Sequence, residues 1–231
     1  MLELFPEGFA QEDRGHSVEL AAFTDEAGAE RMQASFGEIV TARVPPGWAE
    51  EWKRFHQPVQ VGPLWIGPPW EEPTAGLEAV VIDPGRAFGT GAHPTTRLCV
   101  EHLLELERGS VVDIGCGSGV LAIAASRLGF GPVFAVDADE AAVEATERNA
   151  AANAVEVDAR GIDATRDDIP AAQLALANID LSTLPRVRLP AECRRLVTSG
   201  YYESDAVAVP GFTHLARRAR AGWAADLFER K

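Results

Sequence analysis

Short apolar runs alternate with longer stretches of helical periodicity through the second half of this 231-residue chain. The apolar runs, which fit strands, cover residues 111–113, 133–136, 155–157, 174–177 and 196–198. The helical stretches cover residues 120–128 and 139–153, and glycine or asparagine ends them. Strands that alternate with helices predict an α/β fold with a doubly wound, mostly parallel sheet and right-handed crossovers.

The alternation stops near the carboxyl end of the chain. Two runs of β-type residues, 212–218 and 223–228, lie on either side of Gly222 and predict a terminal antiparallel hairpin. A short helix is expected just before them, at about residues 204–209. The predicted sheet therefore begins with parallel strands and ends with antiparallel ones.

The first 44 residues have the pattern of a small α+β piece. Two strands are expected at residues 9–13 and 18–22, because apolar and polar positions alternate in the second of these runs. Asp25 can cap a helix that follows and ends at about residue 36. Residues 38–44 have the pattern of a third strand.

Between these two regions, residues 45–84 contain eight of the fifteen prolines and four of the five tryptophans. Proline at this density disfavours long helices and central strands, whereas tryptophan indicates packing against a neighbour. Two interpretations fit: a clasp that bridges two domains, or a surface that binds a partner. The expected organisation is a small α+β domain at 1–44, a linker at 45–84 and the larger α/β domain at 85–231.

Composition excludes several classes of function. With 35 acidic and 21 basic residues, the formal charge of −14 argues against binding of nucleic-acid phosphates, but it is compatible with a basic protein partner. No apolar run approaches the roughly 18 residues of a membrane span, and no signal peptide is evident. Three cysteines without a C-x-x-C motif predict neither a disulfide framework nor a metal site. We expect a cytoplasmic protein without membrane contact.

A glycine loop follows the first strand of the α/β region. The strand ends in Asp113, then Gly115, Gly117 and Gly119 alternate with other residues, and Ser118 can cap the helix that begins near residue 120. This G-x-G-x-G spacing differs from the G-x-G-x-x-G of dinucleotide-binding loops. A carboxylate before the loop repels a pyrophosphate, but it can recognise the ammonium end of a methionine-like ligand, directly or through water. A methyl donor is therefore favoured, and a dinucleotide remains the alternative.

Polar residues also stand at the ends of two later strands. Asp137 ends the second strand, where a carboxylate commonly accepts hydrogen bonds from ribose hydroxyls in adenosine cofactors of both kinds. It could instead cap the next helix, although Asp139 is better placed for that role. Asn178 follows the apolar run 174–177 and offers a donor and an acceptor. A lone asparagine at a strand end is more often a turn residue. Asn178 is a candidate for cofactor binding because it follows the glycine loop and Asp137 in the expected order.

A loop rich in glycine precedes the first strand of the α/β region and leads into a helix that begins at about Pro94. Thr95 and Thr96 then present their hydroxyls from the first turn of this helix. The loop is either a flexible lead into a capped helix or a lid over the cofactor with Phe88 as its wall. His93 is a candidate base, but most isolated histidines are not catalytic. No catalytic residue is assigned.

Five motifs together resemble the PrmA family, class I S-adenosylmethionine-dependent methyltransferases with a Rossmann-like sheet. The resemblance implies methylation of amino groups, on lysine side chains and the N-terminal amine, of large-subunit ribosomal protein eleven. It also implies that Thr96, Gly115, Asp137 and Asn178 bind S-adenosylmethionine, and Gly117 lies in the same loop. The motifs are Trp52-Lys-Arg-Phe-His, Trp65-Ile-Gly-Pro-Pro-Trp70, Ala87-Phe-Gly-Thr-Gly-Ala-His-Pro-Thr-Thr96, Asp113-Ile-Gly-Cys-Gly-Ser-Gly119 and Ala177-Asn-Ile179.

The sequence departs from this family at its start. The family's amino-terminal substrate domain is ferredoxin-like, with the order β-α-β-β-α-β, whereas Phe9 here already has the pattern of the second strand. We expect a truncated ferredoxin-like domain, which leaves recognition of the family substrate open. Two other functions also remain open: an NAD-dependent oxidoreductase, and a non-catalytic binding protein that retains the methyltransferase fold.

Overall fold

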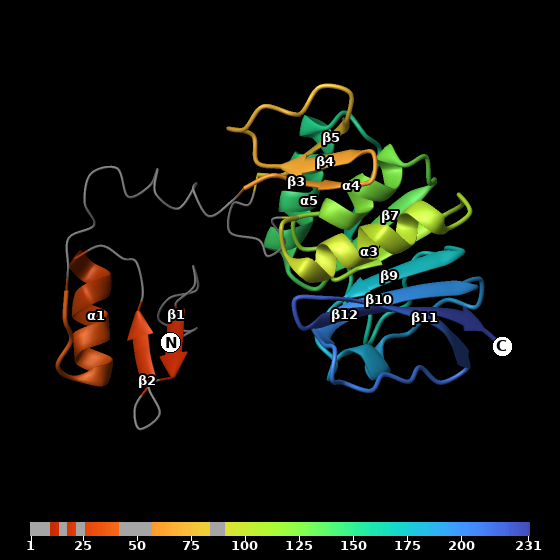
Figure 1. Ribbon diagram of the computed structural model, residues 1–231. Helices are drawn as coiled ribbons and strands as arrows, with labels where there is room; N and C mark the ends of the chain where they lie inside the picture. Colours follow the sequence, from red (N-terminus) through yellow and green to blue (C-terminus); the bar gives the residue numbers. More distant parts are fainter. Residues whose placement is uncertain (1–9, 14–17, 22–25, 42–56, 84–90) are drawn as a thin grey trace. The chain divides into compact units, whose positions relative to one another are not determined.

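Figure 1 shows the computed structural model of the protein, which describes residues 10–13, 18–21, 26–41, 57–83 and 91–231. Contacts divide the chain into two compact units, residues 1–52 and 53–231. No helix in the described ranges is both long enough and apolar enough to cross a membrane.

In its described residues, the smaller unit contains a two-stranded antiparallel sheet and the helix α1. Strands β1 (Ala10–Asp13) and β2 (Val18–Ala21) pair as predicted, and α1 (Glu26–Phe36) follows them. Gly37, with φ of +85°, ends the helix in the left-handed region. The predicted third strand is wrong at residues 38–41. These residues pair with no strand, and Val40 is fully exposed. The remainder of this strand and the predicted cap at Asp25 lie outside the described residues.

The larger unit is built on a seven-stranded sheet of order β11-β12-β10-β9-β6-β7-β8. The five strands from β8 to β10 are parallel, and β12 and β11 continue the sheet as the antiparallel hairpin that the sequence predicts. This confirms the predicted α/β fold with its mostly parallel sheet. The strands are β6 (Val111–Ile114), β7 (Val133–Asp137), β8 (Asp158–Gly161), β9 (Leu174–Asn178), β10 (Arg195–Tyr202), β11 (Phe212–Arg220) and β12 (Trp223–Arg230).

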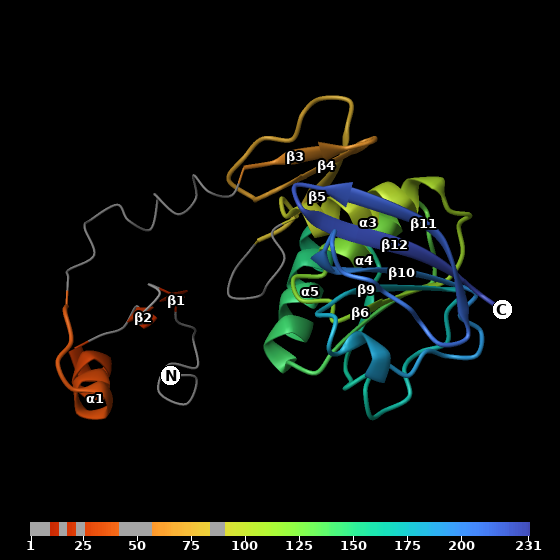
Figure 2. The same cartoon turned by 60° about the horizontal axis from the view of Figure 1, so that its bottom comes forward.

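Three helices cover one face of this sheet: α3 (Pro94–Glu105), α4 (Val120–Arg127) and α5 (Glu140–Ala152). Helix α3 packs on β9, β10, β12 and β11, whereas α4 packs on β6 and β7 and α5 on β7 and β8 (Figure 2). Side chains alternate between the two faces of a strand. Val111, Leu174 and Leu176 accordingly join the core under the helices.

The second face has a thinner cover. Val112, Ala175 and Ala177 pack there against the 3-10 helix η2 (Leu184–Arg186) and against irregular segments, rather than the long helices expected of a doubly wound sheet. The helix predicted at 204–209 is also wrong, because residues 203–211 form turns and extended chain.

Strand direction explains the missing helix. Strands β10 and β11 run the same way, so residues 203–211 must return along the whole length of β10. The eight residues of β10 span about 26 Å, whereas a nine-residue helix spans only about 14 Å. The connection must therefore be extended.

A second sheet of three strands, β3-β4-β5, lies in the predicted linker. Its strands are β3 (Val59–Val61), β4 (Leu64–Gly67) and β5 (Glu78–Val81). Leu64, Ile66 and Val80 are buried in the same core as α3 and α4, so this part of the chain belongs to the larger unit and not to a linker. Strands form despite the prolines because Pro58, Pro63 and Pro68 all lie just outside strand ends.

Candidate functional site

The predicted site residues meet at one edge of the sheet. The strands β7, β6 and β9 are parallel neighbours, so the glycine loop, Asp137 and Asn178 all lie at their carboxyl ends. Helix α3 starts at the same edge, because the ring of His93, at its N-cap, contacts Trp223 at the start of β12. Thr96 is thus in the first turn of a helix that begins beside the other candidates. Open α/β sheets place ligands at this edge.

The glycine loop has a backbone that other residues would not readily adopt. Gly115, Gly117 and Gly119 have φ of +70°, +55° and +79°. A Cβ at Gly115 would lie 2.5 Å from Cγ2 of Ile179, and one at Gly119 would lie 2.8 Å from the side chain of Thr146. Both glycines are therefore required by conformation and by close packing.

Asp113 ties the first strand to the helix after the loop. Its side chain is buried, and Oδ2 accepts a hydrogen bond of 3.1 Å from the backbone amide of Ala122 in α4. The N-cap of α4 is Gly119, which has no side chain, so the predicted capping by Ser118 is wrong. Burial raises the pKa of Asp113 to about 7; the amide of Ala122 opposes this shift and the charge of Asp137 adds to it.

Asp137 connects the loop with the following helix. Its Oδ2 accepts a hydrogen bond from the amide of Gly117 at 3.1 Å, and its Oδ1 accepts one from the amide of Asp139 at 3.0 Å. Asp139 caps α5 by accepting from Ala141 at 3.0 Å, as expected, so Asp137 is free of that role. A carboxylate oxygen can accept more than one hydrogen bond, and Asp137 is only half-buried, so it retains capacity for ligand hydroxyls.

Asn178 ends β9 next to a bulge that sequence reasoning missed. The amide of Ile179 donates to the carbonyl of Ser199 at 3.1 Å, and the register of β10 shifts just after Ser199. Gly200 has φ of +101° there, and a Cβ on it would lie 2.2 Å from the carbonyl oxygen of Ile179. A glycine inside a strand pattern is a signal for such a bulge. The turn after Asn178 can approach β10 only because residue 200 is glycine.

The amino end of α3 is a capped helix start with His93 at the N-cap. The Nδ1 atom of His93 accepts from the amide of Thr95 at 3.4 Å and lies 2.8 Å from its hydroxyl. Burial lowers the pKa of His93, so the ring is neutral near pH 7. Thr95 and Thr96 are buried. Phe88 and the rest of residues 84–90 lie outside the described residues.

Two asparagines that the sequence analysis did not single out, Asn149 in α5 and Asn153 at its C-cap, hold the small sheet against the site. Asn149 accepts from the amide of Asp83 at 3.0 Å and donates to the carbonyl of Ser118 at 2.9 Å. Asn153, one turn later, accepts from the amide of Val81 at 2.8 Å and donates to its carbonyl at 2.6 Å. Their spacing places both on one helix face, which was the only signal available in the sequence.

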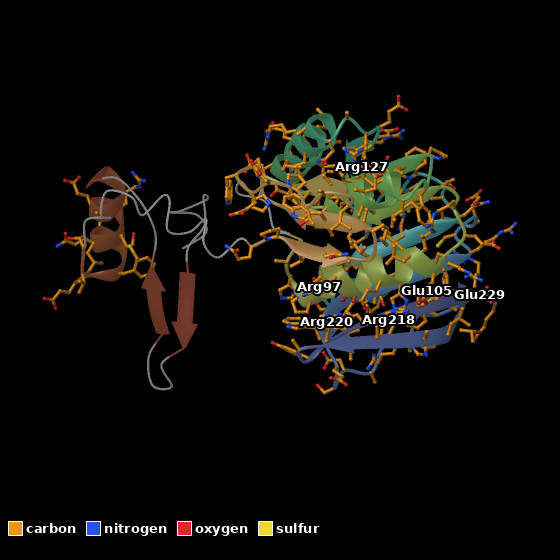
Figure 3. All side chains as sticks on the ribbon, turned by 45° about the horizontal axis from the view of Figure 1, so that its top comes forward. Arg97, Glu105, Arg127, Arg218, Arg220 and Glu229 are labelled. Carbon is orange, nitrogen blue, oxygen red and sulfur yellow. The ribbon has the colours of Figure 1, made fainter. Side chains whose placement is uncertain are left out.

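The terminal hairpin carries a second network that the sequence did not reveal. Asp226 is fully buried, and Arg217 donates to both of its oxygens at 2.9 and 2.8 Å. The hydroxyl of Tyr201 donates to Asp226 at 2.8 Å, which links the hairpin to β10. On the other side of the hairpin, Arg218 pairs with Glu105 of α3 at 2.5 Å (Figure 3). The hairpin is thus fixed to the sheet and to α3.

The chemistry of the site fits a cationic donor better than a dinucleotide. The acidic side chain that contacts the glycine loop is Asp137, which accepts from the amide of Gly117, whereas Asp113 is buried and bonded to α4. Carboxylates favour the sulfonium and ammonium groups of S-adenosylmethionine and oppose a pyrophosphate. Within the described ranges, no group of three or more His, Cys, Asp or Glu residues could hold a metal ion.

Comparison with known proteins agrees with this chemistry. The family model described as ribosomal protein L11 methyltransferase (PrmA) matches residues 14–202. The ribosomal protein L11 methyltransferase of Symbiobacterium thermophilum is 44% identical over 167 residues, covering 69% of this chain and 54% of that protein. Its counterpart from Myxococcus xanthus is 40% identical over 171 residues, covering 70% of this chain and 59% of that protein.

A solved structure gives the same relationship. The ribosomal protein L11 methylase from Lactobacillus delbrueckii subsp. bulgaricus has a TM-score of 0.66 and 26% sequence identity, covering 76% of this chain and 100% of that chain. The chain spans about half the length of the curated relatives it matches. Since the family model covers most of its residues, the chain belongs to the ribosomal protein L11 methyltransferase family.

Proposed function

We propose that this protein transfers methyl groups from S-adenosylmethionine to amino groups of ribosomal protein L11, on lysine side chains and at the N-terminus. The observation that carries the proposal is the glycine loop at the carboxyl end of β6, whose Gly117 amide donates to the carboxylate of Asp137 at the end of β7. Family membership and the strongly acidic chain, which suits a basic ribosomal protein, support the same reaction and acceptor. A ribosomal substrate implies that the protein works in the cytoplasm.

In this proposal five residues bind the donor. The backbone of Gly115 and Gly117 lies against its methionine part, because glycine allows the closest approach. The carboxylate of Asp137 accepts hydrogen bonds from the ribose hydroxyls. Asn178 and Thr96 supply polar groups from the end of β9 and the start of α3.

The acceptor amine must be neutral before it can attack a methyl group. A lysine of ordinary pKa is neutral in only about one part in 2,500 at pH 7, which costs about 4.6 kcal/mol. A bound S-adenosylmethionine supplies an activated methyl group, and its positive charge in a desolvated site lowers the pKa of the amine. The protein mainly aligns the two reactants. Nδ1 of His93 already accepts a hydrogen bond from Thr95, so no general base is assigned.

The test is the intact mass of purified L11 after incubation with this protein and S-adenosylmethionine. We expect the mass of L11 to rise by whole methyl increments. Asp137→Ala at the same concentration is the matched control, and it should need far more donor to reach the same yield. Unmodified L11 together with measurable donor binding would support the non-catalytic alternative. Calorimetric binding of NAD but not of S-adenosylmethionine would support the oxidoreductase.

A further inference from the structure

Three rings from distant parts of the chain meet at the edge of the sheet that holds the proposed donor site. The rings of His93 and Trp223 lie 4.8 Å apart with an edge-on angle of 71°. The ring of Tyr202 lies 4.6 Å from Trp223 on a tilted plane. They come from the N-cap of α3 and from β10 and β12, where Tyr202 and Trp223 are paired residues.

These rings lie at the same edge of the sheet as Asn178. Ser199 is the partner of Asn178 in the register between β9 and β10, and Tyr202 follows three residues later on β10. On the other side of the site, His93 lies three residues before Thr96. The three rings thus flank the space beyond the carboxyl ends of β9 and β10, and none of them has a part in the proposed donor contacts.

Hydrogen bonds fix the backbone beneath Tyr202 and the ring of His93. The amide of Tyr202 donates to Asp205 at 2.9 Å, and the amide of Glu203 donates to the carbonyl of Gly222 at 2.8 Å. His93 is held by its contact with Thr95. Tyr202 nevertheless keeps 57% of its surface exposed. A preformed, accessible ring surface is suited to binding a ligand with little loss of entropy.

An amino acceptor has an ammonium or amino group and an aliphatic chain, and an aromatic ring can bind both. The face of an aromatic ring carries negative electrostatic potential and binds ammonium groups, methylated ones included, while its area packs against aliphatic chain. The cation that is opposite Trp223 in the hairpin does not oppose this. Arg220 beside the hairpin turn is paired with Glu101 at 2.7 Å, and burial lowers the pKa of His93 so that its ring is neutral.

We propose that His93, Tyr202 and Trp223 form the binding surface for the acceptor: an aliphatic chain that ends in an amino or methylammonium group. This inference rests on the proposed function. In the transfer, the lone pair of the neutral amine forms the new N–C bond as the C–S bond of the donor breaks, and its electron pair stays on sulfur. The product is a methylammonium that loses a proton to water before it can accept another methyl group. Rings that hold both the amine and its cationic products allow repeated transfer to one nitrogen.

Kinetics with purified L11 test the role of the rings in the reaction. We expect Tyr202→Ala and Trp223→Ala to raise KM for L11 about tenfold, as loss of a cation–π contact predicts, with the Kd for S-adenosylmethionine unchanged. Tyr202→Phe should restore most of the affinity. Leu215→Ala on β11, which also removes an exposed apolar side chain, is the matched control and should behave as the parent does. An unchanged KM in Tyr202→Ala, or an equal loss of donor affinity, would overturn the inference.

A binding experiment separates this inference from the proposed reaction. The protein is labelled with 5-fluorotryptophan and titrated with N-acetyl-trimethyllysine methylamide, and Trp223→Phe identifies the resonance of Trp223. We expect that resonance to shift while the signal of the buried Trp65 does not. A shift without any turnover of L11 would refute the proposed function but not the ring surface. Turnover without a shift, and with KM unchanged in both alanine variants, would refute the ring surface but not the proposed function.

Discussion

The carboxylate of Asp137 accepts a hydrogen bond from the backbone amide of Gly117, at 3.1 Å across the candidate site. This contact joins the end of β7 to the loop that follows β6, and the other oxygen of Asp137 holds the start of α5. The residue therefore shapes the loop and also offers acceptors to a ligand. A substitution at this position should affect both roles, and the two effects can be separated.

Asp137→Ala should weaken binding of S-adenosylmethionine by about 1.5–3 kcal/mol, because charge-assisted hydrogen bonds to ribose are lost. The free energy of unfolding should fall by less, because the position is half-buried and water can replace the carboxylate. Calorimetric titration and chemical denaturation measure the two quantities. Asp139→Ala serves as control: it removes only the cap of α5 and should cost about 1 kcal/mol of stability without loss of donor affinity. The role in binding would be wrong if both variants bound the donor equally well.

Gly115→Ala should destabilise the protein through backbone conformation and through contact with Ile179. A positive φ costs an alanine about 1–2 kcal/mol, and the new methyl would lie 2.5 Å from Cγ2 of Ile179. Gly129→Ala is the matched control, because Gly129 has φ of +85° with nothing within 4 Å of an added Cβ. We expect Gly115→Ala to cost about 1–3 kcal/mol more than this control, as overpacking does. Combining Gly115→Ala with Ile179→Ala should recover part of that excess in denaturant titrations, and strictly additive losses would contradict the packing argument.

Elements with a strong local pattern could be predicted from the sequence. Strands β6 and β7 and helices α4 and α5 lie within one or two residues of their predicted bounds, because short apolar runs, glycine and Asp139 fix them locally. The strand predicted at 155–157 is displaced to β8, because Asp158–Gly161 is a mostly exposed edge strand with little apolar pattern.

The contacts that shape the site could not be predicted in this way. Asn149 holds Asp83, which is 66 positions away, and Tyr201 holds Asp226, which is 25 positions away. Local patterns contain no information on such pairs, and an asparagine in an alanine-rich helix looks like a surface residue. The bulge at Gly200 depends in the same way on its close approach to Ile179. The sequence therefore locates the site at strand ends, whereas the supports of the site become visible only in the fold.

The buried carboxylate of Asp113 should make stability depend on pH. Its pKa is about 7 in the folded protein and near 3.9 in an unfolded chain, so between these values the folded state holds a proton that the unfolded state has lost. The free energy of unfolding should therefore fall, through this group, as the pH rises from about 4 to about 7, by at most about 4 kcal/mol. Asp113→Asn keeps an acceptor for Ala122 but does not titrate. The difference in stability between the two proteins, measured by urea titration at several pH values, isolates this effect, and a constant difference would refute it.

Asn149→Leu should reduce both stability and donor affinity. It removes the acceptor for the amide of Asp83 and the donor to the carbonyl of Ser118, at a cost of about 1–3 kcal/mol of stability. Because Ser118 is in the glycine loop, S-adenosylmethionine should also bind more weakly. Asn153→Leu breaks similar bonds to Val81 but none to the loop, so it should lower the melting temperature and leave the donor Kd unchanged. Equal donor affinity in the two variants would show that Asn149 only supports the small sheet.

Removal of residues 1–52 tests whether the smaller unit selects the acceptor. The chain divides into compact units at this point, and every proposed donor contact lies at or beyond Thr96 in the larger unit. The fragment 53–231 should therefore bind S-adenosylmethionine with the Kd of the full chain, provided that its circular dichroism shows a folded protein. Methylation of L11 should fall sharply, because the deletion removes β1, β2 and α1, which would dock a macromolecule. The expected signature is a higher KM for intact L11, with no change in KM for a short lysine peptide that reaches only the site. A fragment that methylates intact L11 as well as the full chain does would show that the first unit has no role in recognition, and the rings at the sheet edge would then have to supply the selectivity.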